Sequence, residues 1–411
     1  MPSAITADAD YDAFCQQRLS DPHPFFHRLR AEDPVHWSQT LQCWLITRYD
    51  DAFAGIRDPR VSSSRAGLYM NNLSAENRDR ARPMVEHLSK WVLNVDAPDH
   101  TRLRKLVNVA FTPRMLKRLE PQIEQLVNEL LDGVCAQRRF DFVRDFSYRL
   151  TSTVICRMLG IPNEDQDDFR AAAEVMINFS SAAGPRLNEA VPSAHASYQR
   201  LIRYFDDIID QRRRHPQEDL ISDMLAVNEN NDRFTQEELF AMCVFLYVAG
   251  HETTMSGTAS GMLLLIQNSD QYELLRKDAD KHSPSAVEEF LRLESPAPRS
   301  VRMAREDFEL RGQTIQKGQT IVTLLGAANR DPDQFPDPDR VDILRHPNRH
   351  LGFGFGPHFC LGAPLARLES GIALRNIARR KLQLRMLENE LHWRPNLGLR
   401  SLERLPVEIV A

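Results

Sequence analysis

Residues 350–369, HLGFGFGPHFCLGAPLARLE, surround Cys360 with four glycines and place it just before a helix-forming run. Glycine allows the backbone to turn sharply and to approach a flat or bulky group closely, and Pro357 stiffens the turn. The run after the cysteine predicts a helix whose amino end lies at the sulfur, where the helix dipole and the N–H groups of the first turn favour an anion. This stretch therefore predicts a support for one cysteine in its thiolate form.

A thiolate in such a loop has three chemical interpretations. As an axial metal ligand, it would accept hydrogen bonds from backbone N–H groups, which tune the metal and keep the sulfur ionised. As a nucleophile, it would need a nearby histidine and a third orienting group, and as an isolated buried thiol it would only pack the loop. The other cysteines form no C-x-x-C pair, which argues against a zinc knuckle or a disulfide framework. These cysteines are expected in the core: Cys15, Cys43, Cys135, Cys156 and Cys243.

The string F-x-x-G-x-H-x-C-x-G is filled by Phe353, Gly356, His358, Cys360 and Gly362. At every fixed position it resembles the haem-binding loop of the cytochrome P450 family of haem-thiolate monooxygenases, in its bacterial form. The resemblance implies haem b (iron protoporphyrin IX) as the cofactor and Cys360 as the axial ligand of its iron. It also implies that Phe353, His358 and Gly362 bind the cofactor.

Helical periodicity dominates the rest of the chain, and its strand signals are short. The clearest helical runs are residues 114–134, 151–160 and 197–214, and the clearest strand signals are residues 34–49, 301–310, 319–330 and 404–410. No Gly/Ser linker or internal repeat separates the two halves, so one large domain is expected although the length alone suggests two or three. The prediction is a mostly α chain with small β-sheets, which the resemblance identifies as the cytochrome P450 fold in a single haem-binding domain over residues 1–411.

Residues 235–270 predict one long helix with a polar interruption. Thr235 and Glu238 have capping-box spacing, and the segment AGHETT (249–254) sets polar residues where apolar ones would pack. A buried Thr253 hydroxyl can bond the carbonyl of Ala249 and loosen the helix, although a solvated polar stripe is equally compatible with the pattern. The resemblance implies that Glu252 and Thr253 deliver protons for dioxygen activation. It also implies that Ala249 and Gly250 contact the cofactor.

Haem carries two propionates, which need cationic partners. His100 and Arg104 lie one helical turn apart within residues 96–114, which resemble the propionate-binding helix of the family. Arg302, in the pattern R-x-A, and His358 complete a set of four cations that the resemblance implies. Taken singly, each of these residues is more typical of surface charge.

Glu289 and Arg292 form an E-x-x-R pair on one helix face. Such a pair is usually solvated, but in the family it belongs to a buried network that an arginine of the Pro/Asp-rich segment 329–350 completes. Arg340 and Arg345 both remain candidates for this third position. That segment is predicted to form neither a helix nor a central strand.

The chain contains no G-x-G-x-x-G nucleotide fingerprint after a strand, so electrons must come from another protein. The resemblance implies a ferredoxin and its ferredoxin reductase as the donors. A basic docking patch is predicted from four residues, for which ordinary solvation is the alternative: Arg102, Lys105, Arg114 and Lys117.

The family topology implies that a small hydrophobic substrate and dioxygen meet in a pocket formed by several segments. These are residues 67–93, 165–200, the helix around Val248, residues 297–301 and the loop near Leu397. Arg299 would pair with a substrate carboxylate if it faced this pocket. Two other functions stay open: a peroxide-driven peroxygenase and a non-catalytic haem-thiolate binding protein.

The 57 acidic and 52 basic residues give a net charge of −5, so no attraction to nucleic acid is expected. The first twenty residues contain no apolar stretch long enough for a signal peptide or a membrane anchor. We therefore expect a cytoplasmic monomer without stable membrane insertion.

Overall fold

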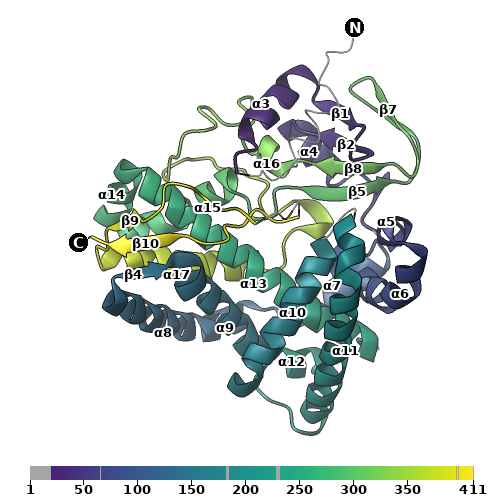
Figure 1. The fold of residues 1–411 in the computed structure, drawn as a ribbon, viewed down its shortest axis with the longest axis horizontal. Helices are drawn as coiled ribbons and strands as arrows, with labels where there is room; N and C mark the ends of the chain where they lie inside the picture. Colours follow the sequence, from purple (N-terminus) through teal and green to yellow (C-terminus); the bar gives the residue numbers. More distant parts are fainter. Residues whose placement is uncertain are drawn as a thin grey trace. The chain divides into compact units, whose positions relative to one another are not determined.

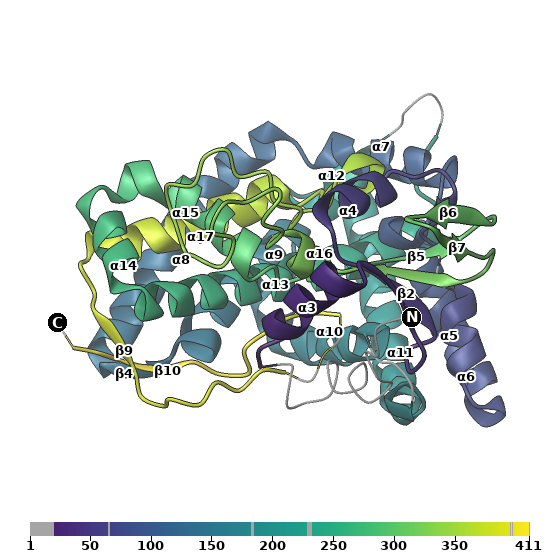
Figure 2. The same cartoon turned by 90° about the horizontal axis from the view of Figure 1, so that it is seen from above.

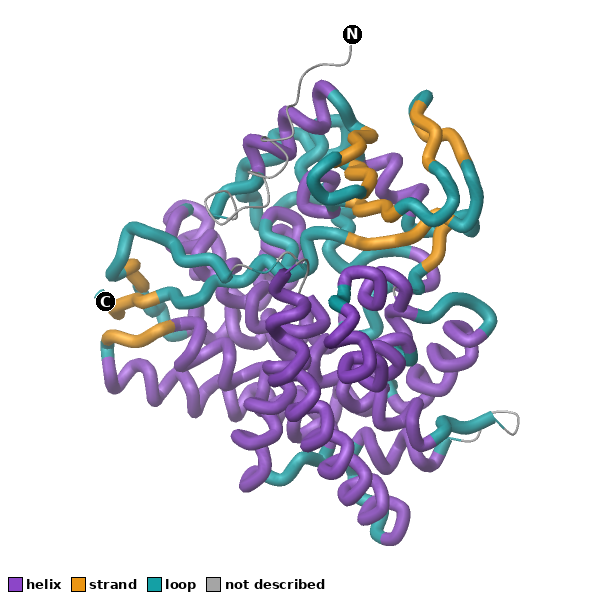
Figure 3. Tube along the Cα trace, turned by 45° about the vertical axis from the view of Figure 1, so that its right-hand side comes forward, coloured by secondary structure: helices purple, strands orange, loops and turns teal. Residues whose placement is uncertain are grey.

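The structure is a computed structural model that describes residues 20–64, 66–181, 185–227, 232–394, 396 and 398–410. The chain groups into two compact units. Unit 1 comprises Met1–Ser62, Glu124–Arg149 and Thr253–Ala411, and unit 2 comprises Ser63–Ile123 and Leu150–Glu252. Helix predominates in both, and Figure 3 shows the strands in orange as a small part of the chain.

The main sheet of unit 1 has five strands in the order β1–β2–β8–β5–β3. The strands are β1 (Val35–Ser38), β2 (Cys43–Ile46), β8 (Thr320–Thr323), β5 (Ser300–Ala304) and β3 (Val61–Ser62). β1 and β2 form an antiparallel hairpin, whereas β2 pairs with β8 in parallel. The predicted strand signal of residues 34–49 is therefore confirmed as this hairpin.

Alternate residues of β2 bury opposite faces of the sheet, as the period of a strand requires. Cys43 and Leu45 pack under α3 (His23–Glu32) with Phe26. Trp44 and Ile46 pack on the other side with Ile315, which belongs to the hairpin of β6 (Phe308–Leu310) and β7 (Gln313–Ile315). Figure 1 shows α3, α4 (Tyr49–Gly55) and α16 (Leu325–Ala328) beside the main sheet.

A second, three-stranded sheet of unit 1 has the order β4–β10–β9. Its strands are β4 (Arg139–Asp141), β10 (Pro406–Ile409) and β9 (Leu384–Met386). The helices of the same unit include α14 (Ser269–Lys277), α15 (Ala279–Leu293) and α17 (Ala363–Arg379). α15 and α17 pack side by side, as Figure 2 shows.

Unit 2 consists of helices. They are α5 (Ala66–Asn72), α6 (Ala75–Ser89), α7 (Asp99–Ala110), α10 (Gln166–Ser181), α11 (Pro185–Arg214) and α12 (Leu220–Ala226). α11 packs against α6, α10 and α12. α8 (Pro113–Gln137), α9 (Tyr148–Leu159) and α13 (Gln236–Gln267) have residues in both units.

Most elements agree with the sequence-based expectations. The helical runs 114–134 and 197–214 fall within α8 and α11, and the run 151–160 matches α9 except for its last residue, Gly160. The last strand signal becomes β10, and residues 329–350 contain no helix or strand. One strand prediction was partly wrong, because only Thr320–Thr323 of residues 319–330 is a strand and α16 follows directly. A continuous apolar run of this length cannot distinguish a buried strand from a short buried helix. The helix after the cysteine begins at Ala363, three residues beyond the sulfur.

Candidate functional site

The cysteine loop of unit 1 is held by its own backbone. The Cys360 N–H donates to the Phe353 carbonyl over 2.9 Å. Gly354 and Gly356 have φ angles of 68° and 71°, which residues with a side chain rarely adopt. A Cβ at Gly356 would also lie 2.7 Å from Cγ of Arg57. These two glycines therefore make the turn that the sequence predicted.

The sulfur of Cys360 lies just before α17, whose N-cap is Gly362. A Cβ at Gly362 would lie 4.0 Å from this sulfur and would meet nothing nearer. Cys360 is partly exposed and does not belong to a disulfide. A partly exposed sulfur at the amino end of a helix, beside a position that lacks a side chain, fits the thiolate ligand of a flat iron porphyrin.

Arg57 supports this loop, although no sequence motif indicated it. Its guanidinium carbon lies 4.3 Å from the ring centroid of Phe53 and 5.0 Å from that of Phe355. The two rings are themselves 4.4 Å apart. The contact joins segments some three hundred residues apart in the chain, so no local pattern could have revealed it.

The four predicted propionate partners are distributed over both units. In unit 1, Arg302 on β5 is buried and donates to the Val301 carbonyl over 2.8 Å, while His358 ends the short 3-10 turn of the cysteine loop. In unit 2, His100 is buried on α7, and Arg104 follows it by one turn. Their convergence on one cofactor stays a prediction.

The segment AGHETT lies within α13, which is α-helical through Gln236–Gln267, so the polar residues do not break the helix. The bond from the Thr253 hydroxyl to the Ala249 carbonyl stays a prediction. Glu252 is 3% exposed, and a carboxyl buried at this depth is a candidate proton carrier. His251 and Thr151 hydrogen-bond over 2.8 Å. A Cβ at Gly250 would lie 2.9 Å from Cδ1 of Ile155 on α9, so this glycine permits close packing of the two helices within unit 2. Thr253 is the first residue of the third segment of unit 1.

The E-x-x-R pair is buried, which settles the choice between its two possible interpretations. Arg292 binds both oxygens of Glu289 at 2.8 Å, and both side chains are 0% exposed. Arg345 is the third member, since its Nε lies 3.2 Å from Glu289. Arg340 contributes only its carbonyl, which accepts from Arg292. Asn348, which the sequence-based analysis missed, also donates to Glu289, over 3.0 Å.

One residue of the predicted basic patch is bound to two carboxylates. Arg102 is half-buried and bound to Glu238 and Asp232 within unit 2, and the hydrogen bond to Glu238 raises the pKa of Arg102. These two carboxylates offset the charge of Arg102, and its part in docking stays a prediction. The three other members are exposed: Lys105, Arg114 and Lys117.

Arg299 lines a pocket of unit 1 that encloses roughly 660 Å³ of empty space, its opening to solvent included. The residues that line the pocket include Phe26, Leu324 and Leu399, and Arg400 lines it as well. Leu397, which was expected near the substrate, lies outside the described residues.

Among the residues described, Cys360 belongs to no group of three or more His, Cys, Asp or Glu side chains that could hold a metal ion. A single cysteine presented in this way fits the class of haem-thiolate proteins. The family model named Cytochrome P450 matches residues 69–390. The chain belongs to the cytochrome P450 family.

Individual relatives extend the match to nearly the whole chain. The Vitamin D(3) 25-hydroxylase of Pseudonocardia autotrophica is 38% identical over 99% of this chain and 98% of its own length. The cytochrome P450 monooxygenase PikC of Streptomyces venezuelae is 37% identical over 97% of this chain and 93% of its own. The crystal structure of P450BioI in complex with an acyl carrier protein carrying hexadec-9Z-enoic acid aligns with a TM-score of 0.87 at 35% identity, over 96% of this chain and 99% of that one.

The protein is a cytochrome P450 monooxygenase of the bacterial type, and its cofactor is haem b held through a cysteine thiolate. The mostly α fold with small sheets is the fold of this family. Across the described residues, no helix is both long and apolar enough to cross a membrane.

Proposed function

We propose that this monooxygenase hydroxylates or epoxidises a small hydrophobic organic molecule, with electrons from a ferredoxin and its reductase. Secondary metabolites, terpenoids, steroids and fatty acids are the substrate classes. The cysteine loop carries the proposal, because the Cys360 N–H bond to Phe353 and the two left-handed glycines present one sulfur at the amino end of α17. The printed names of the relatives, a vitamin D(3) hydroxylase among them, support the substrate range.

Cys360 is the proposed ligand of the haem iron, with Phe353 and Gly362 against the cofactor. His100, Arg104, Arg302 and His358 are the proposed partners of its propionates. Haem b, when bound, supplies the iron at which dioxygen is activated for insertion of one oxygen atom into the substrate. Ala249 and Gly250 are proposed to face the cofactor from α13.

Glu252 and Thr253 are the proposed proton carriers. Glu252, which is 3% exposed, is proposed to pass protons from inside the protein to the Thr253 hydroxyl. The bond between His251 and Thr151 fixes the turn of α13 that carries both residues. The proposed contribution of the chain itself to the chemistry is therefore the delivery of protons through Glu252 and Thr253.

Electron entry is proposed at a basic surface that includes Lys105, Arg114 and Lys117, because ferredoxins present acidic faces and opposite charges steer encounter. The cytoplasmic location and the monomeric state of the enzyme stay predictions. Arg299 is a proposed contact for a carboxylate-bearing substrate, since it lines a pocket together with Phe26, Leu324 and Leu399. The carrier-bound fatty acid in the P450BioI complex makes an acyl carrier protein a further candidate for substrate delivery.

The test begins with the Cys360→His and Cys360→Ser variants of the haem-loaded protein. Wild type should give the thiolate-type carbon monoxide spectrum after reduction, and both variants should lose it. Retention of that spectrum in either variant would reject Cys360 as the ligand. A compound library screened for the low-spin to high-spin shift of the wild-type haem then identifies the substrate class.

Two other functions, a peroxide-driven peroxygenase and a non-catalytic haem protein, predict different results with the same haem-loaded protein. A peroxygenase would turn over its substrate with hydrogen peroxide alone and would not need Glu252 or Thr253. A non-catalytic haem protein would consume no NADPH with ferredoxin and reductase, whatever the ligand. NADPH consumption coupled to product, lost in Thr253→Ala, supports the monooxygenase.

A further inference from the structure

A second cluster of charged side chains lies next to the cysteine loop in unit 1. Arg367 on α17 donates to both oxygens of Glu288 on α15, over 2.7 and 2.9 Å. This bidentate geometry makes arginine–carboxylate pairs strong and directional. Nε2 of His350 lies 3.1 Å from the same carboxylate. The three residues are called the Glu288 cluster below.

The hydrogen bonds of His350 define its tautomer. Its Nδ1 accepts from the Gly352 N–H over 3.0 Å, so this nitrogen carries no proton. The proton is therefore on Nε2, which donates to Glu288. A neutral imidazole, 3% exposed, thus connects the carboxylate to the backbone of the cysteine loop.

The guanidinium of Arg367 also contacts the cysteine loop, through the ring of Phe353. Its Cζ lies 4.5 Å from the ring centroid of Phe353, a cation–π distance. The carbonyl of that same phenylalanine accepts the Cys360 N–H. The hydrogen bond to Glu288 raises the pKa of Arg367, and the negative charge of Cys360 adds to the effect. Guanidinium and sulfur are therefore within electrostatic reach of each other.

We propose that the Glu288 cluster sets how much of the positive charge of Arg367 reaches the thiolate of Cys360. Positive charge near a ligating thiolate weakens its electron donation and favours reduced iron, and the carboxylate of Glu288 offsets part of that charge. Glu288 and Arg367 are positioning residues, since they act through the sulfur. The inference rests on the proposed role of Cys360 as the iron ligand.

The proposal predicts effects of opposite sign for the two partners. Glu288→Gln leaves Arg367 unopposed, so the midpoint potential of the haem-loaded protein should rise. Arg367→Gln removes the cation and leaves the carboxylate, so the potential should fall. Each shift should correspond to roughly a two- to five-fold change in the equilibrium constant for reduction at low salt. The double variant should return close to wild type, and Arg367→Lys, which keeps the charge, should restore most of the potential lost in Arg367→Gln.

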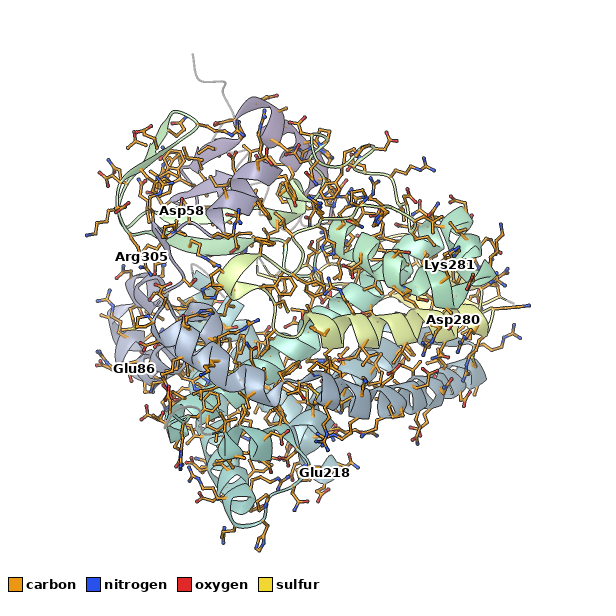
Figure 4. The ribbon with its side chains drawn as sticks, turned by 180° about the vertical axis from the view of Figure 1, so that it is seen from behind. Asp58, Glu86, Glu218, Asp280, Lys281 and Arg305 are labelled. Carbon is orange, nitrogen blue, oxygen red and sulfur yellow. The ribbon has the colours of Figure 1, made fainter. Side chains whose placement is uncertain are left out.

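A matched control exists on the same two helices. Arg379 on α17 donates to Asp280 on α15 over 2.6 Å, about 18 Å further along α17 from Arg367. Figure 4 labels Asp280 beside the carboxyl-terminal part of α17. Asp280→Asn makes the same chemical change as Glu288→Gln but should leave the potential unchanged.

Shifts of the same sign in Glu288→Gln and Arg367→Gln, shifts within error of zero, or an equal shift in Asp280→Asn would overturn the proposal. The carbon monoxide spectrum of each reduced variant separates this failure from failure of the proposed function. If wild type lacks the thiolate-type spectrum, Cys360 is not the ligand. If all variants keep that spectrum and the potentials do not diverge, only the role of the Glu288 cluster is rejected.

Discussion

Glu288 and Glu289 are adjacent on α15, yet their surroundings differ. Glu289 is 0% exposed and is shared by Arg292, Arg345 and Asn348. Glu288 is 26% exposed and binds Arg367 and His350 at the cysteine loop. Because successive helix positions are about 100° apart, the two carboxylates point in different directions. Glu289 meets Arg345 and Asn348, whereas Glu288 meets Arg367 of α17 and also His350, the last residue of the segment 329–350. The fully buried network around Glu289 is placed to hold the fold, whereas the partly exposed pair of Glu288 is the one proposed to adjust the charge at Cys360.

The largest loss of stability is expected when the buried ion pair of Glu289 and Arg292 is broken. Arg292→Ala removes both hydrogen bonds to Glu289 and the bonds to the carbonyls of Asn329 and Pro338. Loss of one partner from a buried ion pair costs about 3–5 kcal/mol, because the other charge stays in the interior. Denaturant unfolding of the haem-loaded protein should show a much lower midpoint.

A second variant, Arg292→Lys, separates the effect of the charge from the effect of the side-chain geometry. A lysine keeps the charge but cannot reproduce the planar fork that reaches two oxygens and several carbonyls, so it should be nearly as destabilised as Arg292→Ala. Wild-type stability in Arg292→Lys would show that net charge, and not geometry, holds the network.

The sequence identified this pair but not its surroundings. The i,i+3 spacing of Glu289 and Arg292 is local and therefore visible in the letters. Their burial depends on how the chain between 329 and 350 returns to α15, and for that reason Arg345 and Arg340 could not be distinguished. The cysteine loop was predictable down to single glycines, since turn chemistry is also local. Glu288 and Arg367 are 79 positions apart, and no spacing rule connects them.

Arg102 and Arg57 show the same limit. Arg102 reads as an exposed cation beside His100, but its carboxylate partners come from Asp232 and Glu238, far along the chain. Arg57 belongs to no motif, and only the folded chain places its guanidinium against the rings of Phe53 and Phe355, which contact each other. Local motifs predicted the loop and the helices, while the long-range charge pairs had to come from the structure.

A fall in pH that protonates Glu288 should reduce the stability of the fold by less than the loss of Arg292 does. Burial would raise the pKa of this carboxyl, but hydrogen bonds from Arg367 and His350 bring it down to about 2. A depressed pKa stabilises the fold above the pKa of the unfolded chain, near 4.5, and this stabilisation is lost as the pH falls toward 2. After allowance for solvent screening, the contribution at neutral pH is about 1 kcal/mol.

Wild type and Glu288→Gln should therefore differ in unfolding free energy at pH 7, and the difference should shrink below about pH 4.5. Unfolding curves of both proteins at a series of pH values measure it. A difference that stays constant down to the lowest pH at which the fold persists would mean that packing of the side chain, and not its charge, stabilises the protein. His350 and Arg367 must remain in place for the comparison, so neither is altered.

The smallest effect is expected at the exposed end of the same helix pair. Asp280 and Arg379 are 60% and 50% exposed, and the hydrogen bond from Arg379 lowers the pKa of Asp280. Exposed pairs gain little, because water and salt screen the charges and the side chains lose freedom. Asp280→Asn should leave the unfolding midpoint within experimental error.

Arg292, Glu288 and Asp280 all lie on α15 and form ion pairs of decreasing burial. If Asp280→Asn destabilised the protein as much as Glu288→Gln, the exposure of an ion pair would not determine how much it stabilises the fold. The contrast drawn between Glu288 and Glu289 would then be wrong as well. Raising the salt concentration provides the independent check. It should reduce the effect of Glu288→Gln and leave that of Arg292→Ala almost unchanged, since screening acts on exposed charges and barely on buried ones.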